Sequence, residues 1–234
     1  SSLAILIFTV CIVLSWHVLS SVNFFFNTLY DLHKIDYQIE KYAPQNRNRS
    51  GFELTNKMEH IRIFRELVSE INSNGAGLEA INYYSENNDK IDSFLTNAEV
   101  AHLTDVCMLI KLMNKFALII GCILLALLLF TWSYKIKYSR YFWKPPNIWL
   151  SLLNMVLLIL AAAGCILIIG PRAVFHKLHE WVFLNKSQWY FYYQDSLMTT
   201  LLPESIFGTI SLLMAAFALL FWIIICYFTN KILL

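Results

Sequence analysis

Two histidine-bearing stretches of this 234-residue chain carry the side chains best suited to acid–base chemistry. In the first, NAEVAHLTDVCMLI, Glu99, His102 and Asp105 are spaced three residues apart. On a helix this spacing spreads the three side chains over roughly 120° of one side. A histidine between two carboxylates can have its tautomer fixed and its imidazolium stabilised. The spacing also fits a solvated helix face with an incidental histidine, and by itself it favours neither interpretation.

The second stretch, PRAVFHKLHEW, begins at Pro171 and carries His176 and His179 three residues apart. Two histidines at this spacing could bind zinc together with His102 and a carboxylate, although no HExxH motif occurs. Because His176 lies just after the end of an apolar run, it is the better candidate for acid–base work. A structural role is favoured for His179. Arg172 could contact a lipid phosphate or carbonyl oxygen, or serve as an interfacial anchor.

Motifs for nucleophilic catalysis are missing from the sequence. It contains no GxSxG elbow and no glycine-rich phosphate loop. Ser187 and Ser196 are candidate nucleophiles, but turn or surface roles are the stronger expectation. The five cysteines show no CxxC or paired spacing, so they indicate neither a disulfide framework nor a thiolate metal site. We therefore predict no metal site and no cofactor.

The elements that must position these residues are set by four runs without Asp, Glu, Lys or Arg: Leu3–Phe26, Phe116–Tyr134, Ile148–Gly170 and Ile206–Phe228. Each approaches or exceeds the ~20 residues with which a helix crosses a ~30 Å hydrocarbon core. Helices are the natural choice because lipid offers no partner for open backbone groups. The first run is too long for a signal peptide and lacks a cleavage site, so it is interpreted as an anchor. We predict an all-α membrane protein, a single domain over residues 1–234 with four transmembrane helices.

The orientation follows from the loop over residues 135–147, which contains four basic residues and no acidic residue: Lys135, Lys137, Arg140 and Lys144. Short basic loops stay in the cytoplasm, so both termini are expected inside. Residues 27–115 and 171–205 are then expected together on the outer face. Apolar residues recur at helical spacing in Leu29–Lys41 and Thr55–Ile71, and a last helix is expected over Thr96–Asn114. This pattern predicts an extracytoplasmic helical cap that lies on the outer leaflet.

At the two histidine-bearing stretches the chain resembles the bacterial lipoprotein intramolecular transacylases. The pattern ExxHLxDV, made by Glu99, His102, Leu103, Asp105 and Val106, is similar to one signature of that family. The other signature resembles the segment that runs from Phe175–His176 through Trp189 and Asp195 to Leu202–Pro203–Glu204 and ends near Phe207. The layout of four spans, a large outer insertion and a shorter outer loop also matches. Two departures are Cys107, where the family usually has Lys, and His179–Glu180, where two aromatics are common.

The resemblance implies a reaction on diacylated lipoproteins of Gram-positive bacteria. An acyl chain would move from the sn-2 glycerol ester to the α-amine of the N-terminal cysteine, which gives the lyso form. An α-amine with a pKa of roughly 7.7–8 is largely protonated at neutral pH, and a neutral imidazole can remove a proton as the amine attacks. Donor and acceptor belong to one molecule, so the enzyme need only select a reactive conformer.

The same resemblance implies roles for particular residues. His176 would be the primary base and His102 the second acid–base residue, with Glu99 or Asp105 orienting His102. Two further residues, Arg172 and Trp189, would hold lipid or stabilise the oxyanion, and Asp195 would brace its loop. The active site is expected on the extracytoplasmic side of the cell membrane, in a monomer that contacts membrane lipid.

Two other functions remain open at this point. One is a zinc-dependent membrane hydrolase that uses His102, His176 and His179. The other is a non-enzymatic membrane sensor whose outer segments bind a peptide or lipid. The formal net charge of +2 gives no argument for a nucleic-acid partner, and none is predicted.

Overall fold

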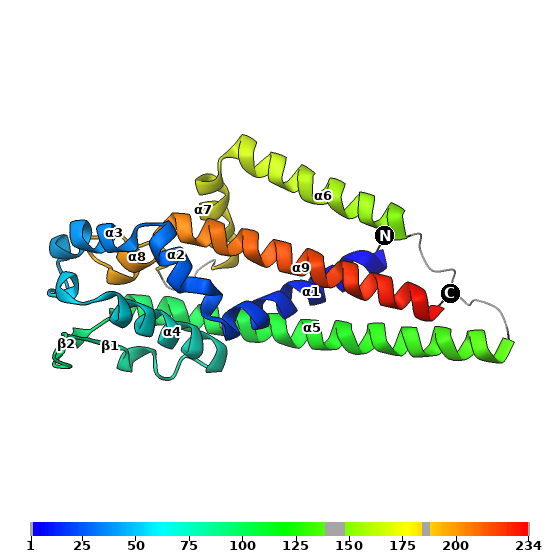
Figure 1. Cartoon of the computed structure of the whole chain (residues 1–234), viewed down its shortest axis with the longest axis horizontal. Helices are drawn as coiled ribbons and strands as arrows, with labels where there is room; N and C mark the ends of the chain where they lie inside the picture. The colour runs from blue at the N-terminus through cyan, green and yellow to red at the C-terminus, as the bar shows by residue number, and fades with distance from the viewer. Residues whose placement is uncertain (1, 139–147, 184–187, 234) are drawn as a thin grey trace. The chain divides into compact units, whose positions relative to one another are not determined.

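Apolar helices dominate the computed structural model, which describes residues 2–138, 148–183 and 188–233 (Figure 1). The chain divides into two units. The span unit comprises Ser1–His17, Met113–Glu180 and Leu213–Leu234, and the mixed unit comprises Val18–Leu112 and Trp181–Leu212.

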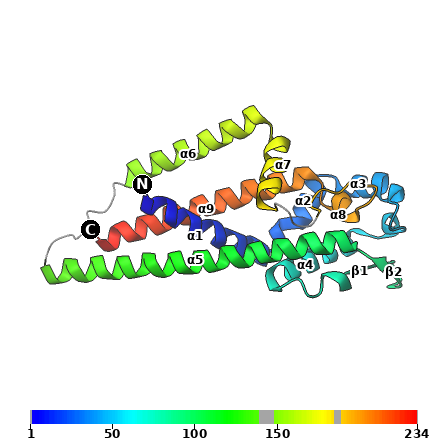
Figure 2. The ribbon, with the colours of Figure 1, turned by 180° about the vertical axis from the view of Figure 1, so that it is seen from behind.

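The span unit is built from long helices (Figures 1 and 2). Those that contribute to it are α1 (Ser2–Ser21), α5 (Asn97–Tyr138), α6 (Ile148–Ile169), α7 (Pro171–Val182) and α9 (Glu204–Leu233). Among the described residues, α1, α5 and α9 are each long and apolar enough to cross a membrane, and the bent pair α6–α7 provides a fourth if it counts as one span. The predicted spans overlap α1, α5, α6 and α9.

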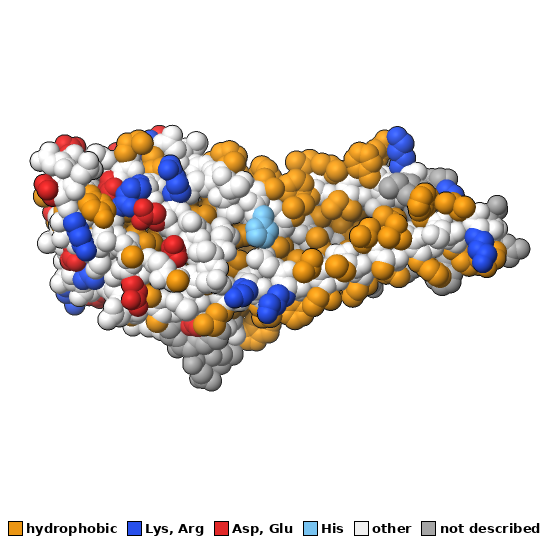
Figure 3. Space-filling view, turned by 90° about the horizontal axis from the view of Figure 1, so that it is seen from below, with side chains coloured by type: hydrophobic (Ala, Val, Ile, Leu, Met, Phe, Trp, Pro, Cys, Tyr) orange, Lys and Arg blue, Asp and Glu red, His pale blue; other side chains and the backbone are white. Residues whose placement is uncertain are grey.

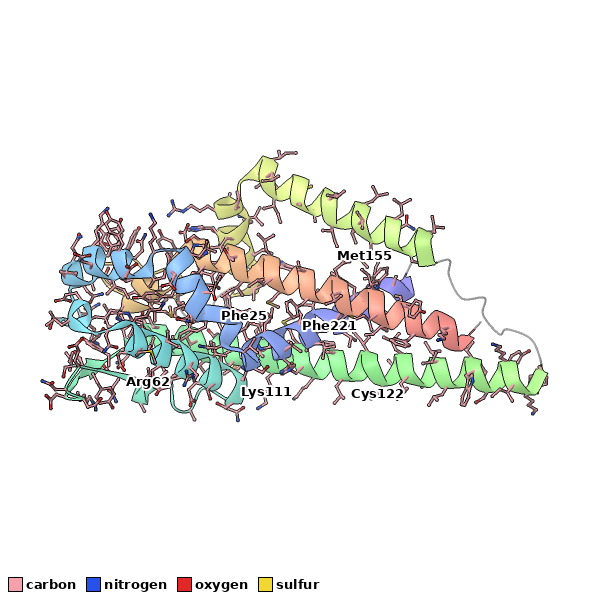
Figure 4. The ribbon with its side chains drawn as sticks, viewed as in Figure 1. Phe25, Arg62, Lys111, Cys122, Met155 and Phe221 are labelled. Atoms are coloured by element: carbon pink, nitrogen blue, oxygen red, sulfur yellow. The ribbon has the colours of Figure 1, made fainter. Side chains whose placement is uncertain are left out.

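The core of the span unit joins three helices that are distant in sequence. Its fully or nearly buried members are Ile7, Cys11, Met155, Ala218 and Trp222. The indole Nε1 of Trp222 donates a hydrogen bond of 3.0 Å to the carbonyl of Ala4, so α9 is tied to the first turn of α1. Met155 and the neighbouring Phe221, which packs against this core, are labelled in Figure 4.

Much of the apolar surface of the span unit faces outward. Leu118, Leu160 and Leu167 expose 68%, 61% and 76% of their surface, and Figure 3 shows hydrophobic side chains spread over the face that it presents. Contiguous apolar surface of this extent marks a membrane or protein contact. Together with the helix lengths, it fits a polytopic membrane protein.

The mixed unit contains shorter elements and charged side chains of both signs (Figure 3). In chain order its elements are η1 (Asn23–Phe25), α2 (Phe26–Leu32), α3 (Ile35–Tyr42), η2 (Ala43–Gln45), η3 (Phe52–Leu54), α4 (Lys57–Ser73), η4 (Leu78–Ala80), β1 (Asn82–Tyr84), β2 (Lys90–Ser93) and α8 (Leu197–Leu201), with the start of α5. The chain is therefore nearly, but not wholly, α-helical.

The strands β1 and β2 form an antiparallel pair in which Tyr83 lies opposite Asp92. Strands of three and four residues are too short for a periodic pattern to reveal, which is why the sequence predicts helices alone. The outer edge of β1 is covered by α4: Arg62 donates to the carbonyl of Asn82 at 2.6 Å, and Tyr84 N–H donates to Glu59 at 2.9 Å. Arg62 is labelled in Figure 4.

A left-handed turn connects α1 to α2. Asn23, Phe24 and Phe25 have φ angles of 53°, 50° and 55°, and each such residue costs roughly 1–2 kcal/mol. The turn buries Phe24 and Phe26, whose rings both pack on Phe64, the latter stacked at a centroid distance of 3.9 Å. Burial of two aromatic rings offsets the backbone strain and leaves Phe25 exposed (Figure 4).

A chain of hydrogen bonds holds His60 neutral in the core of the mixed unit. Thr55 Oγ1 donates its proton to the carbonyl of Phe52 at 2.7 Å, so it accepts from His60 Nε2 at 2.7 Å. The neutral ring then accepts at Nδ1 from Tyr30 Oη, 2.9 Å away. Burial lowers the pKa of His60 from its ordinary value to about 4.

His60 should make the stability of the protein depend on acidity. Its folded-state pKa lies below the unfolded value of ~6.5, so its contribution is complete above pH 6.5 and is lost as pH falls towards 4. The free energy of unfolding should drop by an amount on the order of 3 kcal/mol over that range. Thermal unfolding in detergent between pH 4 and 7 should show a flatter profile for His60→Gln than for wild type. An unchanged slope in this variant would contradict the assignment.

Candidate active site

His102 lies in the second turn of α5, ahead of the part of the helix that can cross a membrane. With 42 residues, α5 is about 63 Å long, roughly twice the thickness of a hydrocarbon core. The imidazole of His102 is buried and packs edge-on against Phe183, with the ring centroids 5.0 Å apart, and against Phe191 at 6.2 Å. Both rings come from the chain that follows α7, so this segment encloses His102.

The start of α5 is set by a reciprocal pair of side-chain caps. Thr96 donates to Glu99 Oε2 from its backbone nitrogen at 2.6 Å and from its hydroxyl at 2.7 Å. Glu99 N–H donates back to Thr96 Oγ1 at 3.4 Å. This is a capping box, which satisfies backbone donors that the first turn of a helix leaves open. Because it sets where the helix begins, it also sets the direction in which His102 points, one turn later.

The other carboxylate oxygen of Glu99 joins α5 to α8. Ser196 Oγ donates to Glu99 Oε1 at 2.5 Å, and both side chains are fully buried. The same hydroxyl accepts from Thr199 N–H at 2.9 Å and so caps α8. Ser196 is therefore a buried helix cap. The expected surface role is wrong. Its side chain is fully buried and its oxygen accepts from Thr199 N–H, so the hydroxyl serves as a cap and is not exposed to a substrate.

A polar loop secures the segment that precedes Ser196. The backbone N–H of Arg47 donates to the carbonyl of Gln194 at 2.7 Å, and the Asn48 amide donates to the carbonyl of Asp195 at 2.9 Å. The Arg47 guanidinium also lies 3.6 Å from the Asp195 carboxylate. This ion pair is largely exposed and contributes little by itself, so the backbone contacts carry most of the connection.

The part played by residues 46–49 cannot be inferred from local sequence. The stretch PQNRNRSG indicates only a turn-rich break, because the partners of Asn46 and Asn48 lie 147 residues further along the chain. Asn46 shows how the turn is made: its side-chain Oδ1 accepts from the backbone N–H groups of Asn48 and Arg49, at 2.9 and 2.8 Å. The turn thereby presents the N–H of Arg47 and the amide of Asn48 to the 194–195 backbone.

The second predicted histidine lies on α7, in the span unit. A glycine with φ of +95°, Gly170, separates α6 from α7, and the two helices meet at 101°. His176 is half-buried in the middle of α7, and Arg172 is exposed one turn earlier. His179 Nδ1 lies 2.9 Å from the carbonyl of Phe175, and its ring packs on the Phe175 ring at 4.0 Å.

The remaining predicted residues lie in the mixed unit. Asp105 is half-buried on α5, one turn after His102. Trp189 is half-buried, and its ring meets that of Tyr190 edge-on at 5.9 Å. The structure thus brings Glu99, His102 and Asp105 together on one helix, and Glu99 is hydrogen-bonded to Ser196. Ser187 lies outside the described residues. Within the described ranges, no group of three or more His, Cys, Asp or Glu side chains is placed to hold a metal ion.

These observations describe a helical membrane protein with histidines on two separate helices. The family model for the lipoprotein intramolecular transacylase Lit matches residues 3–207, which include both His102 and His176. The chain belongs to the lipoprotein intramolecular transacylase Lit family, as the two histidine motifs predict. No curated protein and no solved structure matches it.

Replacing Ser196 should test the connection between α5 and α8. Ser196→Ala removes a donor to the buried Glu99 carboxylate, worth about 1.5–3 kcal/mol, and the α8 cap, worth about 1 kcal/mol. Thermal unfolding in detergent should show a clear loss of stability. The matched control is Ser73→Ala, whose hydroxyl makes one exposed bond to a backbone carbonyl and should change stability by less than about 0.5 kcal/mol. Equal effects in the two variants would contradict this account.

Proposed function

We propose that this protein transfers an acyl chain within a diacylated lipoprotein, from the sn-2 ester of the diacylglyceryl group to the α-amine of the N-terminal cysteine. The product is the lyso form, with one N-acyl and one O-acyl chain. The observation that carries this proposal is the family match over residues 3–207, which spans both histidine-bearing stretches. We infer a Gram-positive bacterial source and a monomer that contacts membrane lipid.

His176 acts as the primary base and His102 as the second acid–base residue. The amine attacks the ester carbonyl, a C–N bond forms, and the bond to the sn-2 glycerol oxygen breaks. Imidazoles suit this step because they exchange protons near neutral pH. The packing of His102 against Phe183 and Phe191 supports its role, since these contacts hold the imidazole in one place.

The supporting residues position the catalytic groups and stabilise the charge that develops on the substrate. Glu99 holds the first turn of α5 through Thr96 and Ser196, and Asp105 lies one turn beyond His102, where it orients the ring. Arg172 and Trp189 hold lipid or stabilise the developing oxyanion by hydrogen bonds. Asp195 braces the loop through its contacts with residues 47 and 48.

The reaction takes place on the extracytoplasmic side of the membrane, to which we assign residues 27–115 and 171–205 as a largely helical cap. Lys135 and Lys137 in the last turn of α5 support this orientation, because basic residues at the end of a span favour the cytoplasmic side.

Single replacement of each histidine tests the assignment. A model lipoprotein is co-expressed with the protein, and its N-terminal peptide is analysed by mass spectrometry. His176→Ala and His102→Ala should each lower lyso-form production by about 10²–10⁴-fold, the usual contribution of general acid–base catalysis. Lys177→Ala is the matched control, because Lys177 lies beside His176 with a side chain that is 84% exposed, and this variant should retain activity.

The outcomes separate the possible failures. If His176→Ala still moves the sn-2 chain to the amine, His176 is not the base. If wild-type protein releases free fatty acid instead of the N-acyl product, the reaction is hydrolysis and the proposed transfer is wrong.

A further inference from the structure

One face of α6 is packed in the first half of the helix and uncovered in the second half. In the first half, Met155 is buried in the core of the span unit and Ile159 packs against that core (Figure 4). At ~100° per residue, Ala162, Ile166 and Ile169 continue this face within about 80° of the helix circumference. Ile166 and Ile169 are 40% and 61% exposed, and Ala162 is exposed as well. These three residues define the open face of α6.

The open face extends over the depth of a single leaflet. With 22 residues, α6 is about 33 Å long and can cross a ~30 Å hydrocarbon core by itself. Residues 160–169 are all exposed except Gly164, which is half-buried. These residues rise about 15 Å along the helix, which is half of the hydrocarbon core. A span of this length has its packed half in one leaflet and its open half in the other, at the end that joins α7.

The helix α7 gives the open half of α6 a polar boundary. It leaves α6 at 101°, so it lies close to the membrane plane when α6 is upright in the bilayer. Arg172, His176 and His179 fall within about 60° of one side of α7. Val174 and Leu178 lie on the opposite side. Helices with one charged and one apolar side are typical of the membrane interface. An apolar face that ends at such a helix matches the two parts of a lipid, its hydrocarbon chain and its polar head.

We propose that the open face of α6 receives the sn-2 acyl chain of the lipoprotein substrate, with the ester at the level of α7. This rests on the proposed function, which supplies the substrate. Surrounding lipid is as apolar as the open face, so contact with the chain contributes little affinity. The contact instead directs the chain and thereby positions its ester beside the helix that carries His176. Positioning of this kind acts mainly on the rate of reaction.

Two matched variants test the contact. Ile166→Trp fills the open face, whereas Ile168→Trp adds the same ring about 200° away on α6 at nearly the same depth, where Ile168 is 87% exposed. Initial rates are measured in detergent with a synthetic diacylated lipopeptide. Ile166→Trp should be about tenfold to hundredfold slower than wild type, because a displaced chain moves the ester, and Ile168→Trp should stay within about twofold. Thermal unfolding shows that both variants are folded.

A second measurement detects the chain without any reaction. The lipopeptide carries a diazirine midway along its sn-2 chain, and the residues that it labels on irradiation are mapped by mass spectrometry. In wild-type protein, residues 160–169 should be labelled, and an excess of unlabelled lipopeptide should suppress the labelling. Ile166→Trp should lose this labelling, and Ile168→Trp should keep it.

The outcomes distinguish the possible occupants of the open face. Equal rates for Ile166→Trp and Ile168→Trp would overturn the proposal. Labelling that unlabelled lipopeptide does not suppress indicates bulk lipid and overturns it too. A dimer in light scattering that only Ile166→Trp dissociates would assign the open face to a second copy of this chain. If wild-type protein shows suppressible labelling but forms no N-acyl product, the proposed function fails and the chain-binding role of the open face stands.

Discussion

The buried carboxylate of Glu99 is the contact on which the described site depends. One oxygen closes the capping box at Thr96, and the other accepts from Ser196. The first bond sets where α5 begins, and the second joins α5 to α8, 97 residues further along the chain. An unsatisfied carboxylate in this buried position would cost free energy. The bond to Ser196 therefore holds α5 and α8 together. Their joint consequence is the enclosure of His102 by Phe183 and Phe191.

Hydrogen-bond partners give the histidines different chemistry in one chain. His60 donates at Nε2 and accepts at Nδ1 inside a core, so both nitrogens are used and the ring is structural. His179 donates at Nδ1 to the backbone carbonyl of Phe175, so the neutral ring carries its proton on Nδ1. Residue type alone does not distinguish these two rings. The carbonyl and hydroxyl groups around them do, because each fixes which nitrogen carries the proton.

The two units meet the demands of different surroundings. Helices of the span unit expose leucines that would be unfavourable in water, while their core is small and includes a Trp222 hydrogen bond to a backbone carbonyl. The mixed unit instead buries aromatic rings, and its side chains hydrogen-bond to exposed backbone groups. Its left-handed turn at residues 23–25 is tolerated because Phe24 and Phe26 pack on Phe64.

From the sequence alone, the uncharged runs determined the helical membrane class, because each is long enough to cross a bilayer. The two histidine motifs determined the family, because each is a pattern of residue types within one stretch of the chain. The roles of His102 and His176 and the sidedness of the loops stay predictions. Only the tertiary structure decided that Ser196 is a buried cap, that residues 46–48 donate hydrogen bonds to the backbone carbonyls of residues 193–195, and that β1 pairs with β2. In two of these three the partners lie about 97 to 147 residues apart, and in the third the strands are too short to show a period. Hydrogen bonds between residues so far apart in the chain leave no periodic pattern in the sequence, so only the folded structure shows them.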